Sequence, residues 1–239
     1  MFNTNIPLYL VAILFALIIN IIIVFLIARK YSYSITEIIC LLLYENVGII
    51  GGAKILTFIQ NYQELKGEFN FFSLGLSSYG AVIGALAFLL LFSLQFKKSL
   101  KELLYIFMPS LPLMYAIGKI GCFLVGCCHG IEYNGIFKIL YKYSTITPNT
   151  YLFPVQIFET ITFLIIFIYM IIKHLKNQFN QKTLGISFVL CGIAKFLLDF
   201  LRMSHKDIII STNQIISIIF IIIGILIIIY NYRINKVKE

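Results

Sequence analysis

The residues best suited to chemistry gather in one short stretch, residues 118–130, with the sequence GKIGCFLVGCCHG. It combines four glycines with three of the chain's five cysteines, and it also carries Lys119 and His129. A lysine can hold an anion such as a phosphate, and a histidine can accept a proton near neutral pH. The stretch follows an apolar run, where unpartnered polar groups are costly, so their gathering indicates a site.

The three cysteines of this stretch, Cys122, Cys127 and Cys128, admit several interpretations. Soft metals bind thiolates, but adjacent cysteines cannot easily wrap a tetrahedral ion, and the paired C-x-x-C spacing of structural zinc sites is absent. A disulfide between neighbours would close a strained ring. One thiol could be a nucleophile activated by His129 or Lys119, or all three could be small residues that allow close helix approach. We expect no metal and no other cofactor.

Other polar residues occur within or beside apolar segments later in the chain. Gln156 and Glu159 share a helix face at the head of one segment, where the plain alternative is a solvated pair. Lys195, Asp199 and Arg202 follow helical spacing on another segment. They predict a charged stripe that faces the bundle interior, with a structural ion-pair network as the alternative.

Two further features lie earlier in the chain. Tyr79 precedes a run of small residues, and tyrosine is common at membrane interfaces for reasons unrelated to catalysis. Glu45 and Lys54 flank Gly48 and Gly52 in the middle of an apolar run. This pattern predicts either a glycine-lined packing face with an ion pair or the lining of a cavity.

The elements that must position these residues are membrane helices. Apolar residues make up 60% of the 239, charged residues 12%, and the mean hydropathy is +0.96, which is far outside the range of soluble domains. The net charge of +9 comes from short clusters between apolar runs, a pattern typical of membrane topology and not of nucleic-acid binding. We expect a single all-α membrane domain over residues 1–239.

The apolar runs predict seven transmembrane helices, and loop charge predicts their orientation. The expected spans are 7–28, 36–60, 78–96, 102–125, 153–173, 183–203 and 208–231. Eleven cations fall in one alternate set of loops and five in the other. The positive-inside rule therefore places the N-terminus outside and the C-terminus in the cytoplasm. His174 and His205 fall beyond span ends and are expected to be solvated.

The central stretch resembles the signature of the prolipoprotein diacylglyceryl transferase family, G-R-[ILV]-G-N-F-x-N-x-E-x-x-G. The glycines and Phe123 match, whereas Lys119 stands for the arginine. Cys122 and Val125 stand for the two asparagines, and Cys127 stands for the glutamate. The chain is thus similar to the family in a divergent, cysteine-rich form.

Other segments carry the resemblance over most of the chain. Gly51-Gly52 followed by Lys54 is similar to G-G-R-I, and residues 78–84 resemble S-F-H-G-G-L-I-G with Tyr79 in place of the histidine. Residues 154–159 resemble P-S-Q-L-Y-E, residues 195–202 resemble R-F-x-x-E-F-x-R, and residues 211–217 resemble S-x-x-Q-x-x-S. Tyr9 loosely corresponds to a tyrosine of the family.

The resemblance implies transfer of a diacylglyceryl group from phosphatidylglycerol to the lipobox cysteine of a prolipoprotein signal peptide, in a multi-pass protein of the bacterial inner membrane. No nucleic acid is expected as a partner, and we expect a monomer. The expected catalytic residues are His129, Tyr79, Lys119, Glu159 and Asp199. The expected substrate-binding residues are Lys119, Arg202, Lys195, Gln156, Cys122, Cys127, Cys128 and Gly130, and no metal ligand is expected.

Two alternatives stay open. A divergent paralogue could keep the lipid-binding bundle and serve a different acceptor, or bind lipid without catalysis, because the polar centre of the signature is replaced. A small-solute transporter would show inverted repeats, and the sequence shows none.

Overall fold

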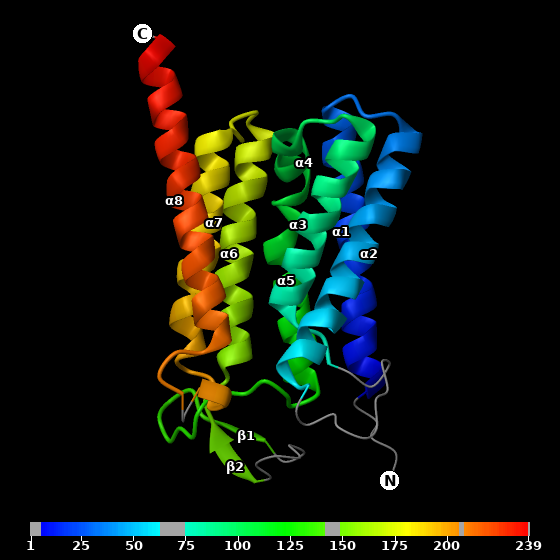
Figure 1. Cartoon of the computed structure of the whole chain (residues 1–239). Coiled ribbons are helices and arrows are strands. Elements are labelled where there is room, and N and C mark those ends of the chain that lie inside the picture. The colour runs from blue at the N-terminus through cyan, green and yellow to red at the C-terminus, as the bar shows by residue number, and fades with distance from the viewer. Residues whose placement is uncertain (1–5, 63–74, 142–148, 206–207, 239) are drawn as a thin grey trace. The chain divides into compact units, whose positions relative to one another are not determined.

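A computed structural model describes residues 6–62, 75–141, 149–205 and 208–238, and these residues are mostly helical (Figure 1). The helices of the described part are α1 (Ile6–Lys30), α2 (Ile35–Gln60), α3 (Ser78–Phe96), α4 (Leu100–Phe107), α5 (Ser110–Leu124), α6 (Val155–Leu175), α7 (Gln181–Asp199) and α8 (Thr212–Lys238). A 3-10 turn, η1 (Met203–His205), follows α7. The strands β1 (Ile139–Tyr141) and β2 (Thr150–Leu152) pair antiparallel between α5 and α6.

Seven of the described helical segments are long and apolar enough to cross a membrane, which confirms the predicted fold class. The chain is therefore a multi-pass membrane protein, while the orientation of its termini stays a prediction. The fourth span, Leu100–Leu124, consists of α4 and α5. The two helices are separated at Met108 and Pro109, since proline lacks the amide hydrogen that a continuing helix needs. Most of the predicted loop 61–77 lies outside the described residues. So do three of the five cations of the second loop set, namely Lys66, Lys142 and Lys206.

The chain divides into two compact units. The large unit comprises Met1–Asn20 and Met108–Glu239, and the small unit comprises Ile21–Phe107. Helix α1 contributes its first part to the large unit and its second part to the small unit. The single domain over residues 1–239 stays a prediction.

In the small unit, α2 and α3 pack through facing glycines. A Cβ atom built on Gly52 would lie 2.2 Å from the carbonyl oxygen of Gly80, and one on Gly84 would lie 2.1 Å from that of Gly48. Real side chains do not reach such distances, so the two backbones approach closely only because these positions lack side chains. The glycine-lined packing face is confirmed, while its ion pair and the cavity alternative stay predictions. Glu45 is fully buried in the same unit.

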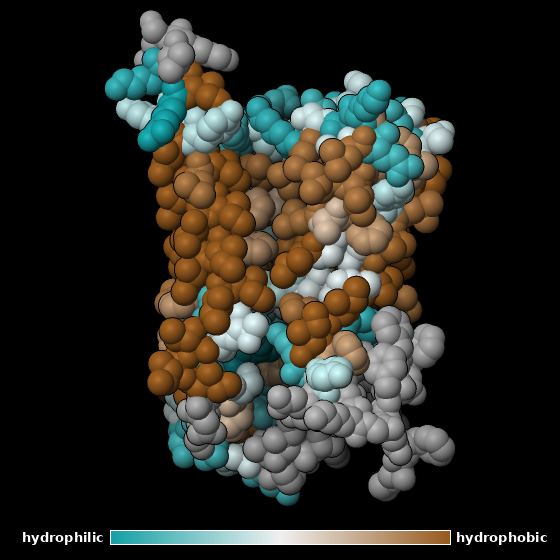
Figure 2. Space-filling view, viewed as in Figure 1, coloured by the Kyte–Doolittle hydropathy of each residue, from teal (hydrophilic) through white to brown (hydrophobic). Residues whose placement is uncertain are grey.

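In the large unit, α5, α6, α7 and α8 pack in chain order. A Cβ on Gly185 of α7 would lie 2.7 Å from the carbonyl oxygen of Gly224, so α7 and α8 also meet through glycines. Hydrophobic side chains cover the exposed length of α8, with hydrophilic ones at its C-terminal end (Figure 2). This is the surface that a lipid-facing helix requires.

The glycine contact gives a direct test of the helix pair. Gly52→Ala is expected to lower the free energy of unfolding by about 1–3 kcal/mol, because its methyl group would force α2 and α3 apart. Thermal unfolding of the detergent-solubilised protein measures this. Gly51→Ala is the matched control, since nothing lies within 4 Å of its Cβ position, and it is expected to be neutral or slightly stabilising. Equal effects of the two variants would contradict the packing argument.

Candidate functional site

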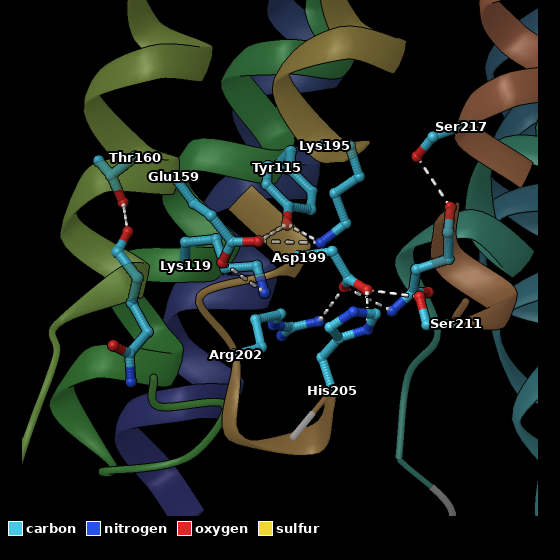
Figure 3. Close-up of polar contacts among 12 residues, drawn as sticks. Tyr115, Lys119, Glu159, Thr160, Lys195, Asp199, Arg202, His205, Ser211 and Ser217 are labelled. Atoms are coloured by element: carbon cyan, nitrogen blue, oxygen red, sulfur yellow. Dashed lines mark hydrogen bonds and ion pairs between the residues drawn. The ribbon is translucent and has the colours of Figure 1, made fainter. Parts of the chain in front are cut away.

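The carboxylate of Glu159 is the centre of a buried charge cluster in the large unit (Figure 3). Lys119 of α5 lies 3.0 Å from Oε2 and Lys195 of α7 lies 2.9 Å from Oε1. The Tyr115 hydroxyl donates to Oε1 at 2.6 Å and accepts from the Lys195 ammonium at 2.5 Å. Glu159 is 0% exposed, so its ion pairs with Lys119 and Lys195 join α5, α6 and α7 through charges held away from water.

A second carboxylate, that of Asp199, lies at the C-terminal end of α7 and is 1% exposed. It accepts hydrogen bonds from the Ser211 hydroxyl and from Nδ2 of Asn213, the latter at 3.1 Å. Nη1 of Arg202 lies 3.8 Å from Oδ1, and Nδ1 of His205 lies 3.7 Å from Oδ2. Asp199 thereby connects the end of α7 to the start of α8 and orients the Arg202 side chain.

Backbone hydrogen bonds join the signature stretch to the segments that carry both carboxylates. The Gly130 amide donates to the Phe153 carbonyl at 3.0 Å, and the Ile131 amide donates to the Leu201 carbonyl at 3.0 Å. The Met203 amide donates to the His129 carbonyl at 3.2 Å. A Cβ on Gly130 would lie 2.5 Å from the Phe153 oxygen and 2.7 Å from the Leu201 oxygen, so only glycine fits at this crossing.

Gln156 fixes the loop that follows α5. Its Nε2 donates to the Cys127 carbonyl at 2.7 Å, and its Oε1 accepts from the Tyr141 hydroxyl at 3.1 Å. Burial raises the pKa of Tyr141, so this hydroxyl keeps its proton as a donor. The Thr160 hydroxyl donates to the Gln156 carbonyl at 2.8 Å and to the Ala116 carbonyl at 3.3 Å, which also holds α6 against α5. Gln156 thus positions the signature stretch.

The end of α5 folds the three cysteines together. Gly126 adopts φ +71, its amide donates to the Phe123 carbonyl at 3.2 Å, and the Cys127 amide donates to the Cys122 carbonyl at 3.0 Å. This pair of bonds is a Schellman cap, which reverses the chain over the last helical turn. Cys128 is also left-handed, with φ 57. As a result the three sulfurs lie within 4.8 Å of one another.

The three thiols differ in exposure and are all free. Cys122 is buried, Cys127 is half-buried and Cys128 is exposed. Hydrogen bonds from the Cys122 and Cys127 thiols, with Lys119 and Arg202 nearby, hold the pKa of Cys128 below its usual range. The Tyr9 ring packs over Gly121 in the same unit, and its hydroxyl is within electrostatic range of the three thiols.

An excess of positive charge and an unpaired guanidinium nitrogen make the site suited to an anion. Lys119, Lys195 and Arg202 face the two carboxylates Glu159 and Asp199, which leaves one positive charge in excess. Among the described residues, buried Nε of Arg202 has no hydrogen-bond partner, although a guanidinium carries five donor hydrogens. A phosphate group would satisfy both the charge and the donors.

Comparisons with known proteins identify the family. Residues 1–230 match the family described as prolipoprotein diacylglyceryl transferase. The chain belongs to this family. A phosphatidylglycerol–prolipoprotein diacylglyceryl transferase 2 of Clostridium perfringens is 34% identical over 198 residues, covering 80% of this chain and 75% of the relative. A phosphatidylglycerol–prolipoprotein diacylglyceryl transferase of Clostridium tetani is 27% identical over 208 residues, covering 83% of this chain and 82% of the relative.

In this transferase-family chain, most of the predicted site residues lie in the large unit and are linked there by contacts. The residues linked by side-chain ion pairs, hydrogen bonds or electrostatic range are Lys119, Glu159, Lys195, Asp199, Arg202, Gln156, Cys122, Cys127 and Cys128. His129 and Gly130 are buried and join the site through their backbones. Tyr79 is buried at the start of α3 in the small unit, and its part in the site stays a prediction.

The structure corrects three expectations. The sixth span ends at Asp199 and not at residue 203, so Arg202 is not on a helical stripe but in a turn paired with Gly130. His205 is 8% exposed and faces Asp199, so it is not solvated. His174 is 4% exposed and stacks on the ring of Phe179 at 4.2 Å, so it is not solvated either.

Sequence reasoning missed Tyr115, Ser211 and Asn213. Tyr115 lies one helical turn before Lys119, and a tyrosine at that spacing in an apolar run was a usable signal. In the sequence, Ser211 and Asn213 lie in the segment 211–217 that resembles the family, and nothing there links them to Asp199. The Ser211 hydroxyl does cap α8, accepting from the Gln214 amide at 3.1 Å, and it also donates to Asp199.

Removing the central carboxylate is expected to destabilise the protein strongly. Glu159→Gln leaves the ammonium groups of Lys119 and Lys195 buried beside each other, at a cost of about 3–5 kcal/mol in the free energy of unfolding. Chemical unfolding in detergent measures this. Glu102→Gln, which alters an exposed carboxylate in α4, is the control and is expected to change little. A small effect of Glu159→Gln would contradict the central role of the cluster.

Proposed function

We propose that this protein transfers a diacylglyceryl group from phosphatidylglycerol to the lipobox cysteine thiol of a prolipoprotein. The transfer forms a thioether and releases glycerol phosphate. The observation that carries the proposal is the buried cluster around Glu159, where three cations face two carboxylates and Nε of Arg202 has no hydrogen-bond partner among the described residues. The names of the relatives describe this reaction for those proteins and support it here.

The phosphate of the lipid binds between Lys119 and Arg202 in this proposal, with Lys195 assisting. As the bond from phosphate oxygen to glycerol carbon breaks, negative charge grows on the leaving phosphate, and fixed cations in a dry site stabilise it. Lys195 is held by Glu159 and Tyr115 and contributes mainly by placing Glu159. Because Lys119 stands where the family signature has arginine, the bidentate contact falls to Arg202.

The thiol proton and the lipid glycerol are assigned to the remaining residues. The acceptor thiol, with a pKa of about 8.5 in free cysteine, must lose its proton before it attacks. His129 or Tyr79 accepts this proton, and Glu159 with Asp199 orients the cations. Gln156 holds the Cys127 carbonyl, which supports a positioning role beside the glycerol.

The site belongs in a membrane because both substrates carry apolar anchors. The lipid supplies two acyl chains and the prolipoprotein supplies a signal peptide, so both reach the site from the bilayer. We propose the bacterial inner membrane as the location, a monomer as the active form, and an N-terminus on the outer side. No nucleic-acid partner is needed for the assigned roles.

Lipidation of a lipobox peptide by membranes that contain the protein tests the phosphate assignment. Lys119→Ala and Arg202→Ala are each expected to lower turnover at least tenfold, because one buried charge-assisted contact is worth about 1.5–3 kcal/mol. Lys176→Ala, which removes an exposed cation after α6, is the control and is expected to keep full turnover. Unchanged turnover in both site variants would reject the assignment.

A divergent paralogue with another acceptor is the second candidate, and the replacement of the signature's polar residues by Cys122, Val125 and Cys127 favours it. Production of this protein in a bacterium that lacks its own transferase separates the two. Growth with diacylglyceryl-modified lipoprotein is expected from the proposed activity. Folded membrane protein without modified lipoprotein would favour the paralogue.

A further inference from the structure

The three cysteines of the signature stretch form a preorganised set of metal ligands. Their sulfurs lie within 4.8 Å of one another. Three sulfurs bound to one zinc ion at about 2.3 Å lie about 3.8 Å apart in tetrahedral geometry, so small side-chain rotations suffice to bring them onto one ion. The Schellman cap at Gly126 holds the backbone in the shape that this requires.

We propose that Cys122, Cys127 and Cys128 bind a zinc-class divalent ion with three thiolates and one open position, and that the open position takes the acceptor's cysteine thiolate. The second half of this inference rests on the proposed function. From the sequence, the adjacency of Cys127 and Cys128 argued against a tetrahedral metal site. In the structure this objection does not hold, because the third thiol, Cys122, comes from the last turn of α5. The left-handed residues Gly126 and Cys128 turn the chain back toward Cys122.

The surroundings of the thiols fit a bound metal ion that an acceptor thiol can reach from the protein surface. Cys128 is exposed, Cys127 is half-buried and Cys122 is buried, so the cluster extends inward from the protein surface. Three protein ligands with a free fourth position are the arrangement of catalytic zinc sites. Lys119 and Arg202 interact electrostatically with Cys128 and offset the negative charge of the thiolates.

The proposed step balances without any change in oxidation state. The acceptor thiol releases its proton to the proton acceptor assigned above when its sulfur binds the ion, since metal ligands bind deprotonated. That sulfur attacks the glycerol carbon that carries the phosphate, so a C–S bond forms and the C–O bond breaks. The electron pair leaves with the oxygen of glycerol phosphate, next to Arg202. A neutral thioether is a weaker ligand than a thiolate, so the product dissociates.

Cobalt(II) alone, added to the reduced, metal-free full chain in detergent, tests the metal site. We expect one ion per chain with thiolate-to-cobalt charge-transfer bands and tetrahedral d–d bands, displaced by zinc. Cys128→Ser and Cys122→Ser are each expected to weaken binding at least tenfold, because even loss of an outer-shell partner costs about 10–100-fold. Cys40→Ser and Cys191→Ser, in α2 and α7, are the matched controls and should bind like the unaltered protein.

Three results would overturn the metal site. The folded protein could take up no stoichiometric cobalt, the serine variants of the cluster could bind as well as the controls, or the cluster could be isolated as a disulfide without metal. Cys128→Ser keeps the test decisive if Cys122→Ser fails to fold, because Cys128 is exposed.

A lipobox peptide added to the cobalt form tests the open position. The cysteine peptide is expected to intensify the charge-transfer bands, and the same peptide with serine is expected to leave them unchanged. Metal-free protein should lipidate the peptide at least tenfold more slowly than the zinc-reloaded protein. Full turnover without metal, or no spectral response to the thiol, would overturn the zinc step while the proposed function stands. A spectral response with no lipidation in any metal state would reject the proposed function instead.

Discussion

The ion pairs of Glu159 are the interaction on which the large unit depends. A carboxylate at 0% exposure is tolerated only because two ammonium groups and a tyrosine hydroxyl surround it. Lys119, Glu159 and Lys195 come from three different helices, so the charges fix how α5, α6 and α7 meet near the site. A buried pair of this kind adds little net stability compared with apolar packing. What the pair contributes is a fixed position for two buried cations, which apolar packing alone could not provide.

A second constraint is that glycine has no side chain, which allows other backbone segments to approach this cluster closely. At Gly130 the chain after α5 passes between the carbonyls of Phe153 and Leu201, so the segments before α6 and after α7 meet at one residue. Arg202 owes its position to this crossing and to Asp199. The glycines of α2 and α3 apply the same principle to the small unit. The ion pairs therefore hold the helices of the site together, and glycine allows the neighbouring backbone segments to pack against them.

The sequence predicted the helices well because apolar length is a local property. The seven spans followed from apolar length, and the inward placement of Lys195 and Asp199 followed from the cost of charge in lipid. The partner of Lys195 did not follow, because it pairs with Glu159 of α6 and not with Asp199 on its own helix. The end of α7 was predicted too late, because Asp199 and Arg202 kept helical spacing while the backbone left the helix to pair with Gly130. His205 was taken for solvated since its partner Asp199 is reached only through the turn η1. Tertiary pairing of this kind has no local signature.

The cysteines show why a departure from a family pattern is best examined in three dimensions. Residue by residue, Cys122 and Cys127 replace polar groups of the signature and suggest loss of function. Together with Cys128 they form one cluster, because the helix cap at Gly126 reverses the chain. The reaction of the family consumes a thiol, and a thiol is activated either by a base or by a metal that lowers its pKa. Cys122 and Cys127 stand at polar positions of the signature and Cys128 at an unspecified one. With the proposed metal they change the means of thiol activation, while the cations that receive the phosphate remain in place.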